Sequence, residues 1–430
     1  NTTADGNTAV GSSCLSANTT GADNVAMGEA ALLSNTTASN NTAIGTSALR
    51  ANTTGADNTA VGKGALASDT TATGNTAVGQ SALDTNTTGS ENTAVGVNAL
   101  DDNVSGFHNT AVGYASLSAN TSNYNSAFGY KALEDNTSGE RNTALGRTAL
   151  EVNTTGDHNT GVGMAALEAN TTGGNNTAVG YAALVANTTA SQNTALGYKA
   201  LTSNTTGANN TAVGKDAGLA VTTGSHNTFM GFLAGDAVTT GGTNIAIGYD
   251  SGHTLITGSY NCYIGNESVG ASASDRQYEI VLGTTNSSLV GKGNSTAFIA
   301  PGATGNVYNG ANSTTWAQIS DERIKKNIED NTTGLNAINQ IRVRNFEYRT
   351  LDEITDFDEP RAAVVEKEGI QLGVIAQEIE TILPDMVTTE STGVKTVDAD
   401  NMTWYLVNAV KELSTQVDEL KAEIQTLKGE

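Results

Sequence analysis

The 430-residue chain has few aromatic and few basic side chains, and each shortage excludes a class of protein. Aromatic residues make up 5% of the sequence, and Asn, Thr, Ala and Gly crowd its first 270 positions, so that part holds no large aromatic core. Lys and Arg number 21 against 44 Asp and Glu, a net charge of −23, which argues against duplex nucleic acid as a partner. The chain also lacks a run of about 18 apolar residues, so we expect no membrane-spanning segment.

A five-residue pattern, Asn-Thr-Ala-Val-Gly, takes the place of an ordinary core. Each step of the pattern is 17 residues long except the step from Asn109 to Asn125, which is 16. A fixed short period is typical of a solenoid, in which each repeat buries its apolar side by stacking on its neighbours. The first Asn of the pattern falls at positions 7, 24, 41, 58, 75, 92, 109, 125, 142, 159, 176, 193, 210, 227, 244 and 261.

One repeat, residues 58–74, shows how a rung is expected to fold. Ala60-Val61 and Ala65-Leu66 are its apolar residues, and Gly62 between them permits a sharp corner after a short strand. The second half of most repeats is Asn-Thr-Thr-Gly, which is turn chemistry, and the stacked Asn side chains are expected to form amide ladders. The fold class is therefore mainly β: a solenoid shaft over residues 1–269.

The chain begins in phase with the repeat, which indicates a rod that continues upstream of residue 1. Asn1-Thr2-Thr3 matches Asn18-Thr19-Thr20 one period later, and there is no initiator Met.

Cys14 and Cys262 lie fifteen rungs apart, on the order of 70 Å at about 4.8 Å a rung, so they cannot pair within one chain. We expect no metal and no cofactor.

The composition changes twice after the repeats end. Short β-type segments from about Gly270 predict a β-rich neck over residues 270–319. From Ser320 charge and helix propensity rise together, which predicts a small α+β domain over residues 320–430. In the last three repeats Ala-Leu gives way to Ala217-Gly218, Ala234-Gly235 and Ser251-Gly252, which predicts a changed cross-section there.

The final segment, residues 404–428, predicts a coiled coil. Its apolar residues alternate steps of four and three over three heptads, with charged residues on the flanks. This a/d seam does not fix the number of strands, but a fibrous rod ahead of it favours a parallel trimer. The seam residues are Leu406, Val410, Leu413, Val417, Leu420, Ile424 and Leu427.

The repeats resemble those in the heads of trimeric autotransporter adhesins of the YadA type and in the shafts of phage tail fibres. That resemblance implies a homotrimer of parallel β-coils. The stretch from Ser320 resembles the intramolecular chaperone autoprocessing domain of phage endosialidases, tailspikes and tail fibres. Two further blocks, residues 341–348 and residues 372–387, agree with that family.

The chaperone resemblance implies a self-cleaving Ser-Lys dyad. It places the nucleophile at Ser320, the base at Lys325 and the scissile bond between Ile319 and Ser320, with a single hydrolysis in cis and no outside substrate. Without the resemblance, Ser320 before Asp321 and Glu322 would be interpreted as a helix N-cap with acids in the first turn. The two downstream blocks favour the dyad.

Several functions fit these features. We expect a trimeric fibre of a phage virion tail that binds a host-surface glycan or protein, and a bacterial surface adhesin is the alternative. An ice- or glycan-binding solenoid would use the recurring Thr row, for example Thr59, Thr76 and Thr93. A depolymerase would need acidic pairs and aromatic sugar platforms, which the rod does not offer. A weak glycan stripe would have to come from Tyr114, Tyr130, Tyr181 and Tyr198.

Overall fold

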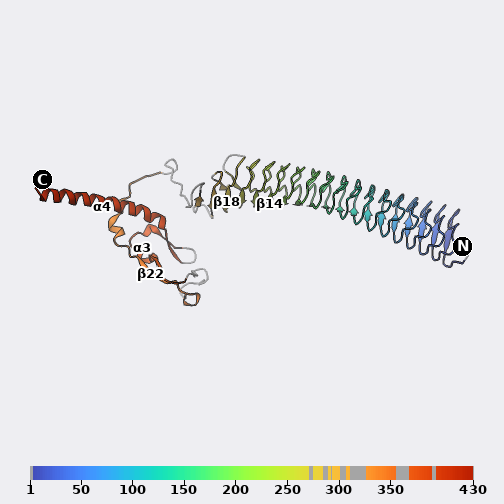
Figure 1. The fold of residues 1–430 in the computed structure, drawn as a ribbon, viewed down its shortest axis with the longest axis horizontal. Coiled ribbons are helices and arrows are strands. Elements are labelled where there is room, and N and C mark those ends of the chain that lie inside the picture. The colour runs from blue at the N-terminus through green and yellow to red at the C-terminus, as the bar shows by residue number, and fades with distance from the viewer. Residues whose placement is uncertain are drawn as a thin grey trace. The chain divides into compact units, whose positions relative to one another are not determined.

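The computed structural model describes residues 3–270, 275–283, 289–291, 293–300, 307–309, 326–354, 368–389 and 394–429. The chain divides into two compact units, Asn1–Ile319 and Ser320–Glu430. The first unit is a β-solenoid, and the second is a small α+β unit with one long helix (Figure 1). The predicted fold class, mainly β with a repetitive solenoid followed by a small α+β unit, is confirmed.

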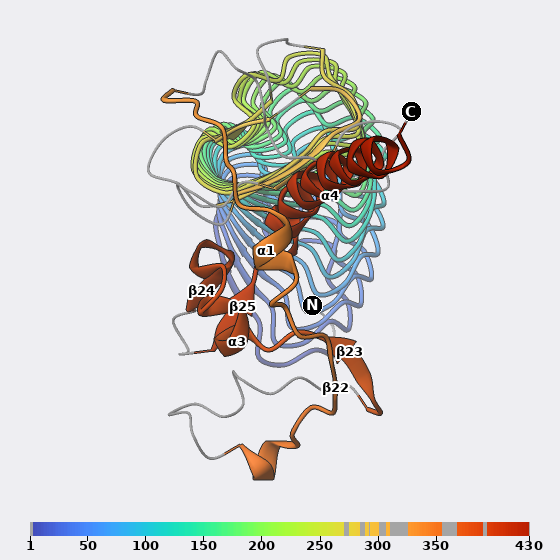
Figure 2. The same ribbon diagram turned by 90° about the vertical axis from the view of Figure 1, so that its left-hand side faces the viewer.

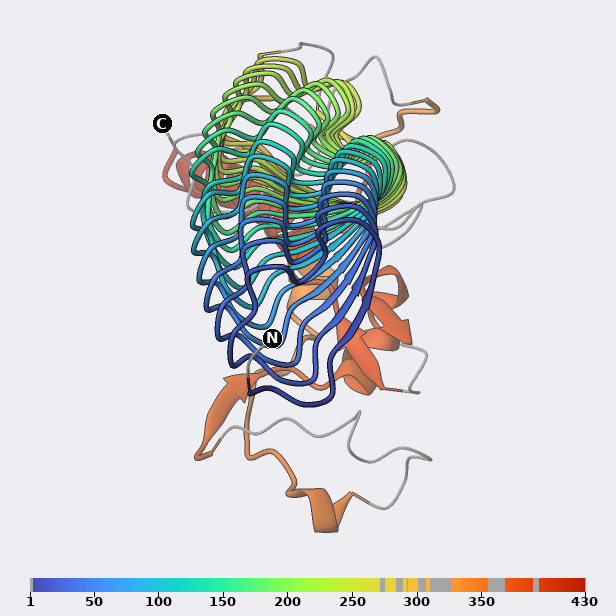
Figure 3. The same ribbon diagram turned by 90° about the vertical axis from the view of Figure 1, so that its right-hand side faces the viewer.

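Sixteen three-residue strands make up the regular solenoid. Each strand pairs with the next in parallel and in register, for example Ala60 with Ala77, so one rung stacks directly on another (Figure 3). The strands are β1 Thr8–Val10, β2 Val25–Met27, β3 Thr42–Ile44, β4 Thr59–Val61, β5 Thr76–Val78, β6 Thr93–Val95, β7 Thr110–Val112, β8 Ser126–Phe128, β9 Thr143–Leu145, β10 Thr160–Val162, β11 Thr177–Val179, β12 Thr194–Leu196, β13 Thr211–Val213, β14 Thr228–Met230, β15 Ile245–Ile247 and β16 Cys262–Ile264.

The core of each rung consists of two Ala and one Leu. Ala60, Ala65 and Leu66 are fully buried, as are their counterparts in most rungs. The Val of the repeat is not part of this core. This corrects the expectation that Ala60 and Val61 contribute to the apolar side of the rung together. Successive residues of a strand point to opposite faces, so Val61 points away from the core with Thr59. Neither Thr59 nor Val61 is fully buried.

The corner after each strand requires glycine for two reasons. Gly96 has φ of +142°, and a Cβ added there would lie 2.2 Å from the carbonyl oxygen of Gly113 in the next rung.

The core Leu also takes a positive φ, 53° at Leu66, a conformation that costs roughly 1–2 kcal/mol for a non-glycine residue. Full burial of a Leu side chain contributes about 1.5–3 kcal/mol, which offsets that strain.

Two buried Asn ladders run along the rod; the second of them, through the Asn of the Asn-Thr-Thr-Gly turn, was predicted from the sequence. In the first, Oδ1 of Asn41 accepts the backbone N–H of Asn58 at 3.0 Å, and the Asn58 amide donates to the carbonyl of Ala72 at 2.8 Å. In the second, the Asn52 amide donates to Oδ1 of Asn35 at 3.1 Å. These bonds pair buried polar groups between rungs, so they are structural.

The short step between Asn109 and Asn125 leaves the strands in register. Strands β7 and β8 still pair Thr110 with Ser126, so the missing residue is taken from the turn. There the Ser122 hydroxyl donates to the carbonyl of Gly139 at 2.6 Å and accepts from the Asn125 amide at 3.0 Å. The hydroxyl therefore connects adjacent rungs across the shortened turn.

The rod keeps its architecture where Gly replaces Leu. Phe229 stands where other rungs have the strand Ala and is fully buried. A Cβ on Gly235 would lie 2.4 Å from its ring, and one on Gly218 would lie 2.9 Å from it. The ring thus fills the space of the missing Leu side chains, and Tyr263 lies in the same way against Gly252. Parallel pairing continues through these rungs. The predicted change of cross-section is therefore a size exchange within the core: a large aromatic side chain at the strand position compensates for the missing Leu.

The sheet also continues past residue 269, where the sequence repeat ends. Strand β16 pairs in parallel with β18 (Ile280–Gly283), and β18 pairs in parallel with β20 (Ala297–Ala300). Val281 and Phe298 occupy the inward position of these strands and are buried. The remaining strands of this region are β17 Ser268–Val269, β19 Leu289–Val290 and the antiparallel β21 Val307–Asn309. Strands β18 and β20 of the predicted neck are thus further rungs of the rod.

The second unit combines short elements with the long helix α4. Its elements are α1 Leu335–Ile338, β22 Arg344–Phe346, the 3-10 helix η2 Leu351–Glu353, β23 Gln371–Gly373, α3 Ala376–Glu380, the 3-10 helix η3 Pro384–Met386, β24 Val387–Thr389, β25 Lys395–Val397 and α4 Ala399–Leu427. Helix α1 lies beside α4 (Figure 2). Among the described residues no helix is long and apolar enough to cross a membrane.

Candidate functional site

The predicted cleavage site lies outside the described residues. Ile319, Ser320 and Lys325 all fall in the undescribed segment, so their roles stay predictions. The residues that follow, 326–334, are described and are not helical; α1 begins only at Leu335. The described part of this unit therefore begins directly after the residues predicted to form the dyad.

The two downstream blocks that resemble the chaperone family meet in space. Strand β22 comes from the first block and β23 from the second, and they pair antiparallel with Asn345 opposite Leu372. Arg344 contacts both carboxylate oxygens of Glu378, with Nη2 to Oε1 at 2.6 Å and Nε to Oε2 at 3.3 Å. The hydrogen bond from Arg344 holds the pKa of Glu378 below its usual value. This ion pair ties α3 to the strand pair.

The end of the second block lies in the small core of the unit. Leu383 and Met386 are buried with Ile379 and Tyr405, and Tyr405 comes from α4. The Tyr405 hydroxyl donates to the Asp385 carboxylate. That hydrogen bond is the main reason why the pKa of Tyr405 rises to about 12. The Tyr405 hydroxyl therefore stays protonated, and can donate this hydrogen bond, well into the alkaline range.

Helix α4 also holds the segment that follows the predicted dyad. The Asn408 amide donates to the carbonyls of Asn331 and Thr333, at 2.8 and 3.2 Å. Glu412 Oε2 accepts the backbone N–H of Leu335 at 2.8 Å. Since Lys325 lies six residues before Asn331, α4 anchors the chain close in sequence to the predicted site.

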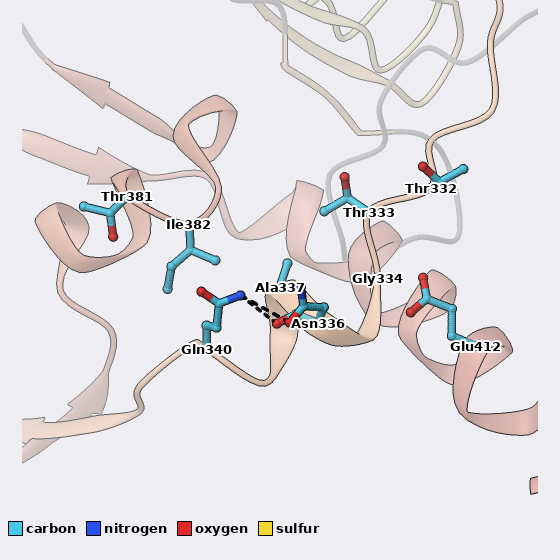
Figure 4. A pocket seen from close by; sticks show the side chains of 9 residues that line it. All are labelled: Thr332, Thr333, Gly334, Asn336, Ala337, Gln340, Thr381, Ile382 and Glu412. Atoms are coloured by element: carbon cyan, nitrogen blue, oxygen red, sulfur yellow. Dashed lines mark hydrogen bonds between the residues drawn. The ribbon is translucent and has the colours of Figure 1, made fainter. Parts of the chain in front are cut away.

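A polar pocket of about 440 Å³ opens beside this anchor (Figure 4). Glu412 reaches it from α4, and the Gln340 amide donates to the Asn336 carbonyl at 3.0 Å on the α1 side. The described residues contain no group of three or more His, Cys, Asp or Glu that could hold a metal ion. The lining residues are Thr332, Thr333, Gly334, Asn336, Ala337, Gln340, Thr381, Ile382 and Glu412.

The predicted coiled-coil seam forms one side of α4 and is exposed along its whole length. Val417 is the least exposed of the seven seam residues at 40%, and Leu427 is the most exposed at 81%. Tyr405 and Ala409, four residues apart on a different side of the helix, are buried. Helix α4 thus uses one face for the core of its own unit, while no apolar partner covers the a/d seam among the residues that the structure describes.

The Tyr residues weighed as a glycan stripe stack on one another. Tyr114 and Tyr130 lie 5.4 Å apart between ring centroids with 11° between their planes, and Tyr181 and Tyr198 lie 5.1 Å apart at 14°. In each pair one face of each ring is covered by the other ring, while all four side chains remain between 42% and 49% exposed. The four Tyr residues therefore form two separate stacked pairs, each between adjacent rungs, and not one continuous stripe.

Sequence reasoning missed three contacts of the C-terminal unit. They are the Arg344–Glu378 ion pair, the Tyr405–Asp385 hydrogen bond and the Glu412 contact to Leu335. Arg344, Glu378 and Asp385 all lie in or beside the family blocks, so the blocks contained a signal for two of these contacts. Nothing in the sequence connects Glu412 with a backbone group 77 positions away.

Comparison with known families adds one match. Residues 320–388 match the family described as chaperone of endosialidase. Neither the search of curated proteins nor the search of solved structures gave a match. The chain therefore joins a β-solenoid of 17-residue rungs to a C-terminal domain similar to the chaperone of endosialidase.

Proposed function

We propose that this chain forms a trimeric phage-tail fibre whose C-terminal unit acts as an intramolecular chaperone. In this proposal the unit brings three chains together in register and then cleaves the chain before Ser320. The observation that carries the proposal is the combination of a nearly uniform rod with a domain similar to the chaperone of endosialidase. The exposed seam of α4 supports it.

A uniform rod does not by itself determine how several copies align, and a domain at the end of each chain can set that alignment. Most rungs of β1–β16 carry a Thr and an apolar residue on the outward side, so two chains displaced by one rung would still place residues of the same kind opposite each other. Such displaced pairings are traps for repetitive proteins. The C-terminal unit lacks the 17-residue repeat of the rod, so it offers one defined end from which the chains can be aligned.

The number of chains rests on family resemblance. The seam places Val410, Val417 and Ile424 at a positions and Leu at d positions. By itself that pattern favours two strands in a parallel coiled coil. The trimer is proposed because the chaperone resemblance and the repeat resemblance both imply three chains, and sedimentation equilibrium of the full chain measures the number directly.

The proposed cleavage needs only groups within the chain. The Ser320 hydroxyl oxygen adds to the carbonyl carbon of Ile319 while neutral Lys325 accepts the hydroxyl proton. The amide nitrogen of Ser320 leaves with a proton, and water hydrolyses the resulting ester to give a carboxylate at Ile319 and a free hydroxyl at Ser320. Burial of Lys325 in the assembled oligomer would lower its pKa and link cleavage to assembly.

Intact mass spectrometry of the full chain tests the cleavage. Wild type and Lys326→Met, the matched control, are expected to release a fragment of residues 320–430, whereas Ser320→Ala and Lys325→Met are expected to stay uncut. An uncut wild type would refute self-cleavage and leave the assembly to be judged by sedimentation. Cleavage of Ser320→Ala would place the chemistry elsewhere.

The biological setting is proposed from the same resemblance. We place the fibre on a phage tail, where it would contact a host-surface glycan or protein. A bacterial surface adhesin is the alternative because the repeats also resemble adhesin heads. Antibody labelling of purified virions against intact cells distinguishes the two: label on tails supports the phage fibre, and label on the cell envelope supports the adhesin.

A further inference from the structure

The outward face of the parallel sheet is a second apolar surface that stays uncovered within the described part of the chain. It consists of the first and third residues of strands β1–β16, here called the sheet face. The third residues are Val, Met, Ile, Phe or Leu in every strand; nine of them are exposed, seven are partly exposed and none is buried. Val10 is 54% exposed and Val95 is 36% exposed.

The sheet face carries no charge although the chain is strongly charged. On each of the sixteen strands the first and third residues point outward, and no Asp, Glu, Lys or Arg stands at these positions. The whole chain, in contrast, has a net charge of −23. Acidic and basic residues of the rungs stand at other positions, such as Asp57 in the turn and Lys63 after the corner glycine. Two copies approaching through the sheet face therefore avoid placing like charges opposite each other.

The length and spacing of the sheet face further limit which kind of partner can cover it. The pairing stays in register from Val10 to Ile264, so the apolar row repeats once per rung over the whole regular rod. A partner that covers the row must have the same repeat over the same length. A second copy of this chain has both. Two outward residues on each of sixteen strands also exceed the 20–30 residues per side of a standard protein interface.

Ice fits the face less well than a protein partner. An ice-binding face needs one small side chain repeated without change, and the first row approaches this with Thr at most positions. The third row varies from Val61 to Met27, Leu145 and Phe128. Side chains of different size can interdigitate with another protein surface but disrupt the match to a crystal lattice.

We propose that the sheet face is the surface through which copies of this chain pack along the rod. This inference rests on the proposed oligomeric fibre and adds where its chains meet in the solenoid. The seam of α4 would start the contact at the C-terminal end, and the sheet face would continue it rung by rung.

Cysteine protection in the full chain tests the inference. The background carries Cys14→Ala and Cys262→Thr, which restore the residues that most rungs have at those positions. Val95→Cys then places one thiol on the sheet face, and Val104→Cys places a control thiol on the turn, 47% exposed and nine residues further on. Sedimentation of each variant and its rate of reaction with a maleimide are measured under native conditions.

The outcomes separate this inference from the proposed function. An oligomer in which Val95→Cys reacts at least tenfold more slowly than Val104→Cys supports the sheet face as the interface. An oligomer with similar rates at both positions overturns the inference and leaves the proposed fibre standing; thermal hysteresis in that case would assign the face to ice. A monomer would refute the proposed assembly, and the inference with it.

Discussion

The solenoid and the C-terminal unit bury their apolar residues in different ways. In the solenoid the core Leu and the strand Ala of most rungs are covered by the rungs before and after them, so the core is almost fully buried within one chain. In the C-terminal unit Ile379, Leu383, Met386 and Tyr405 form a small core, and the seven seam residues of α4 stay outside it. Neighbouring rungs thus stabilise a core that is separate from the exposed sheet face, whereas in the C-terminal unit a single helix, α4, contributes both to the core and, through its seam, to the surface left for association.

The largest expected loss of stability comes from a Cβ added at the corner of a rung, where neighbouring backbones lie in contact. Gly96→Ala puts a Cβ 2.2 Å from the Gly113 carbonyl oxygen at φ of +142°, which should cost about 4 kcal/mol or more and break the stacking of β6 on β7. Gly161→Ala is the matched control, since most rungs have Ala at that strand position. It should be neutral or stabilise by less than about 1 kcal/mol. Thermal unfolding followed by circular dichroism measures both, and equal losses would mean that the corner does not require glycine.

The next largest effect tests the size exchange near the end of the regular rungs. Phe229→Ala empties the space beside Gly218 and Gly235 and should destabilise the rod by about 3–5 kcal/mol. Gly235→Leu alone should also destabilise, because its Cβ already clashes with the ring. The double variant restores the Ala and Leu of a regular rung and should be more stable than either single variant. A double-mutant cycle in urea measures this coupling, and additive losses would contradict the exchange.

The features that sequence reasoning predicted are those that repeat. The period predicted the strands, the Asn ladder of the turn and the glycine corner, because each depends on contacts between equal positions of neighbouring rungs. The outward direction of Val61 follows from strand alternation, yet the clustering of Ala60 and Val61 suggested one apolar block. The continuation of the sheet through Val281 and Phe298 could not be predicted from the period, since large inward side chains replaced the repeated Ala.

In the C-terminal unit the sequence predicted the long helix and its seam, because heptad spacing is a local signal. Contacts between distant segments, such as Glu412 with Leu335, depend on tertiary packing and have no signature in one sequence. The predicted dyad is a different case, because Ser320 and Lys325 lie outside the described residues and their assignment comes from the family resemblance.

The third prediction concerns the one acid in the second Asn ladder. Asp69 is fully buried; its Oδ1 accepts the N–H of Ala72 at 3.0 Å, while Oδ2 has no hydrogen-bond partner. Burial raises the pKa of Asp69 to about 7. Because the folded chain holds this proton more tightly than the unfolded chain, stability should fall as pH rises from about 4 to about 7 and level off above that.

Asp69→Asn restores the ladder and should remove the share of the pH dependence that comes from Asp69, while other acids with raised pKa values, such as Asp101 at about 6, keep theirs. At pH 8 it should stabilise the rod by about 2–4 kcal/mol, and at pH 4 it should change stability little, because the protonated acid resembles the amide. Asp102→Asn at an exposed position of the same region is the control and should have little effect at either pH. Urea unfolding at pH 4, 6 and 8 measures the difference. A gain that is the same at every pH would show that Asp69 is not the titrating group.

The smallest expected effect is confined to the C-terminal unit. Glu412→Ala removes the carboxylate that accepts the Leu335 N–H at 2.8 Å, which should cost about 1 kcal/mol because other acceptors, including water, can reach this half-buried donor. Glu419→Ala, seven residues further along α4 and exposed, is the control. Amide hydrogen exchange should speed up at Leu335 in the first variant alone, with the solenoid amides unchanged. Faster exchange in the rungs as well would show that the two units unfold together, and the contrast between a self-covered rod and an independently anchored C-terminal unit would have to be given up.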